Sequence, residues 1–62
     1  MTGAELRKIR KAANLSEEGL SQLLFYNAKA IRNWEQGKHP IPTGMREQLI
    51  RMGIDVDAIL KS

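Results

Sequence analysis

Residues 15–37 read LSEEGLSQLLFYNAKAIRNWEQG, a pattern that predicts two short helices joined by a tight turn. Ser16 is a suitable N-cap for the first helix, and the two glutamates that follow it complement the helix dipole. Asn27 is the corresponding cap of the second helix, and Gly37 suits the left-handed position that follows a helix end. The buried stripe of the first helix is expected to consist of Leu20, Leu23 and Leu24. Two helices joined by so few residues are expected to cross at a steep angle.

The second of these helices has an apolar and a polar face on a helical wheel. Its apolar face holds Ala30, Ile31 and Trp34, so Trp34 is predicted to be a core residue rather than a stacking platform. Its polar face holds Ala28, Lys29, Arg32, Asn33 and Gln36. B-DNA's major groove admits a helix, and Arg, Lys, Asn and Gln can read the base edges there. The alternative at this point is a solvated polar face that binds nothing.

The remaining sequence also predicts helices. Thr2 and Glu5 have the spacing of a capping box, and a helical apolar pattern follows them. Pro40 and Pro42 exclude a helix between Gly37 and about residue 43. Two more helices are expected at about residues 43–61, the last one capped by Asp55. Nothing reads as a strand, so the sequence predicts a single all-α domain over residues 1–62.

Composition limits the function classes. The chain has 62 residues, 42% of them hydrophobic, and a formal net charge of +3. This basic balance, with seven basic and four acidic side chains in residues 1–38, favours a polyanionic partner. There is no cysteine, which excludes disulfides and thiolate metal sites. The longest apolar run, Leu23–Tyr26, is too short to span a bilayer, so a cytoplasmic protein is expected.

The segment LSEEGLSQLL followed by IRNWEQG resembles the helix-turn-helix of the Cro/C1-type (Xre) repressors. That family's pattern reads approximately L-S-Q-E-E-L-A-x-x-L-G-V-S-x-x-x-I-S-R-W-E-x-G, and the two align without a gap. The resemblance extends from about Leu6 to Ile54. It implies a compact five-helix, lambda-repressor-like domain with the helix-turn-helix at about residues 16–37. The implied protein is a bacterial or phage-encoded, nucleoid-associated repressor that binds double-stranded DNA, usually as a homodimer on a two-fold operator.

The resemblance also implies roles for individual residues. The expected base-reading residues are Ala28, Lys29, Arg32 and Asn33. Lys29 or Arg32 would favour guanine, and Asn33 would favour adenine. Gln36 and Lys38 are expected to contact phosphates, which set register rather than sequence. Weaker phosphate candidates are Arg7, Lys11 and Arg46. The alternative for each cation is a solvated surface charge.

The chain departs from the family pattern at several positions, including Glu17, Gly19, Ser21 and Phe25. Gly19 stands where the family usually has Glu and weakens the helix by up to about 1 kcal/mol relative to Ala. Ser21 replaces a small Ala and fits a close helix crossing. Phe25 replaces the usual turn Gly, so it is strained by about 1–3 kcal/mol if the turn needs a positive φ. Glu17 replaces a Gln that approaches DNA in family members. Because a carboxylate repels phosphate, we do not expect Glu17 to contact the DNA backbone.

Arg10 lies on the apolar side of the first helix, where a charge usually has a partner. Glu35 lies at the edge of the buried side of the Ala28–Gln36 helix and is the best candidate. The resemblance implies the same pair. We therefore expect a structural ion pair between the two side chains.

The C-terminal third contains the candidate dimer surface. Ile50 lies off the apolar stripe of its helix and is expected to point outward. The other candidates for an apolar patch are Ile54, Val56, Ile59 and Leu60. The alternative is a C-terminal helix that folds back over its own core.

Other function classes have weaker support in the sequence. His39 is the only histidine, and no catalytic constellation, glycine-rich phosphate loop or metal-ligand spacing occurs, so we expect no enzyme, cofactor, metal or small-molecule ligand. One alternative is an antitoxin or controller protein whose DNA binding is coupled to a protein partner. The chain ends about nine residues after Gly53, which favours the stand-alone repressor over that reading. The other alternative is a protein-interaction module on the same scaffold.

Overall fold

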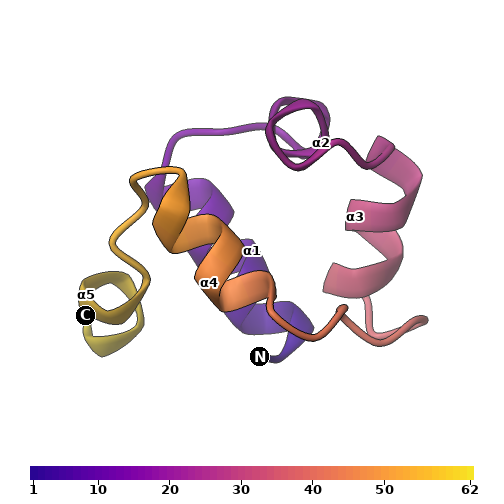
Figure 1. The fold of residues 1–62 in the computed structure, drawn as a ribbon. Coiled ribbons are helices and arrows are strands. Elements are labelled where there is room, and N and C mark those ends of the chain that lie inside the picture. The colour runs from indigo at the N-terminus through magenta and orange to yellow at the C-terminus, as the bar shows by residue number, and fades with distance from the viewer.

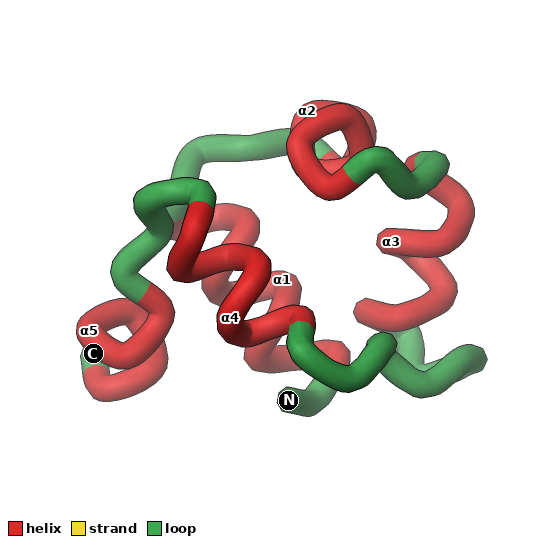
Figure 2. The backbone as a smooth tube through the Cα atoms, viewed as in Figure 1, coloured by secondary structure: helices red, strands yellow, loops and turns green.

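The computed structural model describes all 62 residues and contains five α-helices and no strand (Figures 1 and 2). The helices are α1 (Gly3–Ala12), α2 (Glu17–Leu24), α3 (Ala28–Glu35), α4 (Met45–Arg51) and α5 (Val56–Lys61). The predicted all-α class is confirmed. No helix is long and apolar enough to cross a membrane.

Side-chain caps start four of the five helices, as their sequences predict. The Thr2 hydroxyl accepts from the Glu5 N–H at 3.1 Å, and the Glu5 carboxylate accepts from the Thr2 N–H at 2.8 Å. Ser16 Oγ accepts from the N–H of residue 19 at 2.9 Å, and Asn27 Oδ1 accepts from the N–H of residue 30 at 2.7 Å. Asp55 caps α5 in the same way, at 3.3 Å. Helix α4 is the exception, because it starts at Met45 after Gly44 in the left-handed region (φ 88°), with no side-chain cap.

All five helices contribute to one core of nine buried side chains. These are Leu6, Ile9, Leu20, Leu24, Ile31, Trp34, Met45, Leu49 and Val56. Trp34 is 6% exposed, which confirms it as a core residue. Helix α5 packs back against α1, and the half-buried Ile59 and Leu60 lie against this core.

The prediction that Leu23 is buried is wrong, because its side chain is 39% exposed. Ser21 is buried instead, at 4% exposure, and its hydroxyl donates to the Glu18 carbonyl at 2.6 Å. The buried face of α2 is therefore centred between Leu20, Leu24 and Ser21. At 100° per residue this centre leaves Leu23 more than a quarter turn away.

Helices α2 and α3 form a helix-turn-helix arrangement. They pack closely. In Figure 1 α2 is seen nearly end-on whereas α3 is seen from the side, so the two helix axes cross steeply. The turn contains Phe25 in the left-handed region, with φ 60° and ψ 35°. The Phe25 side chain is 91% exposed, whereas Tyr26 packs edge-on against Trp34 with ring centroids 4.7 Å apart. Of the two aromatic residues in this turn, only Tyr26 packs against another side chain of the fold.

The start of α1 lies directly against the end of α3. A Cβ atom built on Gly3 would overlap the carbonyl oxygens of Trp34 and Glu35. A glycine is therefore required here by the close approach of the two backbones.

Candidate nucleic-acid interface

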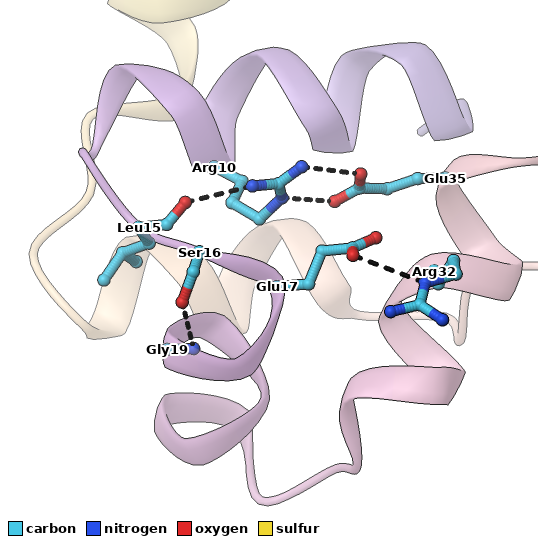
Figure 3. A network of polar contacts seen from close by, with 7 residues as sticks. All are labelled: Arg10, Leu15, Ser16, Glu17, Gly19, Arg32 and Glu35. Atoms are coloured by element: carbon cyan, nitrogen blue, oxygen red, sulfur yellow. Dashed lines mark hydrogen bonds and ion pairs between the residues drawn. The ribbon is translucent and has the colours of Figure 1, made fainter.

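An ion pair between Arg10 and Glu35 connects α1 to α3 (Figure 3). Arg10 Nε and Nη2 donate to the two carboxylate oxygens of Glu35 at 2.7 and 3.0 Å. The Nη1 group donates to the Leu15 carbonyl at 3.0 Å, so the guanidinium also holds the loop before α2. The side chains are only 11% and 5% exposed, and the hydrogen bond to Glu35 raises the pKa of Arg10 further above its usual value. The predicted pair is confirmed, and it fixes the relative placement of three helices.

The polar face of α3 lies opposite its core-facing side chains. Ile31 and Trp34 are buried, whereas Lys29 and Arg32 are exposed. Of the other expected base-reading residues, Ala28 and Asn33 are half-buried. The packing of Ile31 and Trp34 therefore orients the two cations toward solvent. It leaves on this face a small side chain, two cations and an amide.

A polar hollow of about 240 Å³ lies beside this face. It is lined by Arg7, Arg10, Glu17, Arg32, Glu35 and Gln36, with no hydrophobic side chain. Two expected phosphate contacts, Arg7 and Gln36, thus lie together with the expected base reader Arg32. Of the remaining phosphate candidates, Lys11 and Lys38 are exposed but do not line the hollow.

A second ion pair, between Glu17 and Arg32, was not predicted from the sequence. Glu17 is the first residue of α2, and its Oε1 accepts from Arg32 Nε of α3 at 3.4 Å (Figure 3). The Arg32 side chain is 57% exposed and that of Glu17 is 27% exposed. The sequence indicates this pair only through the opposite charges of two residues in helices that are expected to cross. A helical wheel of either helix alone does not show that the two side chains meet.

Arg46 is engaged elsewhere in the fold. Its Nη2 group donates to both carboxylate oxygens of Asp57, at 2.5 and 2.7 Å. This contact joins α4 to α5, and the hydrogen bond raises the pKa of Arg46. Among the expected phosphate contacts, Arg46 is therefore the one already paired with a carboxylate of its own chain.

The C-terminal surface contains one exposed large apolar side chain, Ile50, which is 43% exposed. This confirms the expected outward orientation of Ile50. A shallow hollow of about 320 Å³ beside it is lined by Ile50, Gly53, Ile54, Asp55, Val56 and Asp57. Val56 itself is fully buried and belongs to the core, and Ile54 is half-buried. Of the other members of the candidate dimer patch, Ile50 and Ile54 line this hollow together, whereas Ile59 and Leu60 are half-buried against the core and do not line it.

Comparison of the chain with protein-family models, curated proteins and solved structures finds no match. Within the structure, no group of three His, Asp or Glu side chains is placed to hold a metal ion.

Proposed function

We propose that this chain is a sequence-specific double-stranded DNA-binding domain of Cro/C1 type that reads the major groove with α3. The observation that carries the proposal is the orientation of α3 within the helix-turn-helix arrangement. Its buried Ile31 and Trp34 direct Lys29 and Arg32 toward solvent. A helix with this face fits the major groove, where Arg and Lys pair with guanine and Asn with adenine.

Charge placement supports the same surface. The walls of the polar hollow bring guanidinium groups of α1 and α3 next to that face. Cations at the rim of a groove-binding helix neutralise phosphates and set its register on the duplex. We assign phosphate contact to Arg7, Gln36 and Lys38, with Lys11 as an outer cation. Arg46 is the weakest of these candidates, because Asp57 already neutralises it.

The proposed biological form is a homodimer on a two-fold operator, acting as a small repressor. Ile50 and Ile54, which line one shallow hollow, supply the proposed contact. Because this apolar patch is small, the dimer is expected to be weak in free solution and to assemble on DNA.

Selection from a random duplex library tests the proposal, with an Arg32→Ala, Asn33→Ala double variant selected in parallel. The expected result is enrichment of a two-fold site with half-sites about one helical turn apart, which the variant fails to enrich. Enrichment of a short asymmetric site would retain base reading and refute the dimer. Binding that enriches nothing and vanishes by about 200 mM salt would refute sequence-specific recognition.

A second function, DNA binding coupled to a protein partner, is favoured by one observation. Phe25 is 91% exposed, and its neighbours Leu23 and Tyr26 are 39% and 41% exposed. An apolar side chain held outward beside other exposed apolar groups is typical of protein contacts. A Phe25→Ser variant that loses a partner captured by the wild-type chain, yet binds DNA equally well, would support this second function.

A further inference from the structure

The ion pair between Glu17 and Arg32 lies inside the proposed DNA-binding surface. It is weak by geometry, because one nitrogen–oxygen contact of 3.4 Å joins two partly exposed side chains. The Arg10–Glu35 pair beside it has two short contacts between nearly buried groups. Exposed single-contact pairs are broken at little cost, whereas buried bidentate pairs are not. The hollow therefore has one fixed pair and one exchangeable pair.

The charges that line the hollow are almost balanced. Three guanidinium groups face two carboxylates there. Arg10 and Glu35 satisfy each other, which leaves Arg7 and Arg32 as cations and Glu17 as the opposing anion. Glu17 therefore cancels one of the two positive charges that this wall could offer to a phosphate.

The contact is not needed to hold α2 against α3. Leu20, Leu24 and Ile31 are at most 2% exposed and supply the packing between these two helices. The capping of α2 is supplied by Ser16, which accepts a hydrogen bond at the helix start. A role in DNA recognition thus fits the pair better than a structural one.

We propose that Glu17 is a specificity-determining residue that holds Arg32 in the free protein and releases it only when a base edge offers a better partner. The inference rests on the proposed function. A contact between Arg32 and a phosphate replaces the Arg32–Glu17 ion pair poorly, because the carboxylate of Glu17 stays nearby and repels that phosphate. A guanine offers the guanidinium two acceptors, O6 and N7, away from the backbone. Glu17 therefore weakens backbone-only binding more than binding to the correct site.

The test compares Glu17→Gln with Glu18→Gln as a matched control. Glu18 is the next residue of α2, is exposed and forms no ion pair, so both variants change the net charge equally. Affinity for a random-sequence duplex is measured by fluorescence anisotropy over a range of salt concentrations. For Glu17→Gln we expect binding about fivefold tighter, the factor of a unit charge about 4 Å away in water. The salt dependence should steepen by about 0.9 in slope, the value of one additional neutralised phosphate. Thermal denaturation confirms that both variants are folded.

Introducing Glu17→Gln into an Arg32→Ala chain tests whether Arg32 is the cation that the loss of Glu17 releases. If Glu17 acts by holding Arg32, then Glu17→Gln gives no steeper slope in that background. If wild type binds DNA but Glu17→Gln and Glu18→Gln change its affinity equally, the inference is overturned while the proposed function stands. If Glu17→Gln binds DNA more weakly than wild type, the inference is likewise overturned and the proposed function stands. If neither the wild type nor any variant binds DNA at about 50 mM salt, the proposed function and this inference fall together.

Discussion

Replacement of Arg10 by Met tests how the first three helices are held together. The substitution keeps most of the side-chain length and removes the guanidinium. It leaves the Glu35 carboxylate, 5% exposed, without donors that lie at 2.7 and 3.0 Å. It also removes the donor to the Leu15 carbonyl at 3.0 Å. Loss of one partner thus leaves a nearly buried charge uncompensated.

The expected cost follows from that burial. Removal of one partner of a buried ion pair costs about 3–5 kcal/mol. A single core in a domain of this size seldom supplies more than about 3–5 kcal/mol in total. We therefore expect the Arg10→Met variant to be largely unfolded at room temperature.

The assay is urea denaturation followed by circular dichroism, with a double variant as the control. Arg10→Met combined with Glu35→Leu removes both charges, and such apolar replacement of a buried pair is often close to neutral. The double variant is therefore expected to be more stable than Arg10→Met alone. A loss of less than about 1 kcal/mol in the single variant would show that the pair does not hold the helices together, because that is the range of an exposed pair.

Three further substitutions test local features. Phe25→Gly should raise the free energy of unfolding by about 1 kcal/mol, because relief of the left-handed strain, about 1–3 kcal/mol, exceeds the entropy cost of glycine. An unchanged or lower Tm would contradict this. Gly3→Ala should lower stability by about 1–3 kcal/mol, since the new methyl group overlaps the backbone of Trp34. A Tm equal to that of wild type would show that the two backbones can separate freely. For Glu5, hydrogen bonding to the Thr2 backbone lowers the carboxyl pKa below its usual 4.5. The stabilising contribution of the Glu5 carboxylate to the folded state is therefore present above pH 4.5 and is lost as the pH falls through the lowered pKa. The difference in free energy of unfolding between wild type and Glu5→Gln should therefore shrink in acid. A difference that does not vary with pH in urea denaturation would count against this role.

Features that depend on short-range chemistry could be predicted from the sequence. The caps at Thr2, Ser16, Asn27 and Asp55 involve residues three positions apart, so their spacing alone identifies them. The burial of Trp34 followed from helical periodicity. The Arg10–Glu35 contact spans 25 residues, yet it was predictable because a charge on an apolar face requires a partner.

Features that depend on how short helices rotate against one another could not be predicted. Ser21 is buried and Leu23 is exposed because of the way α2 is rotated about its axis. The apolar pattern of an eight-residue helix does not determine that rotation. The Glu17–Arg32 contact depends on the crossing of two helices and on the rotamers of two long side chains. The positive φ of Phe25 and the exposure of its side chain both depend on the geometry of the turn, which the residue types alone do not determine.

In the proposed complex, α3 and the adjoining polar hollow face DNA. Amide chemical-shift mapping of the nitrogen-15-labelled chain tests this most directly, with a random duplex of about 20 bp, two helical turns, at about 50 mM salt. We expect the shifts to concentrate on the polar face of α3 and around the hollow and to leave the surface of α5 unchanged. The residues expected to shift are Ala28, Lys29, Arg32, Asn33, Arg7 and Gln36. Shifts confined to α4 and α5, or no shifts at equimolar duplex, would contradict this expectation.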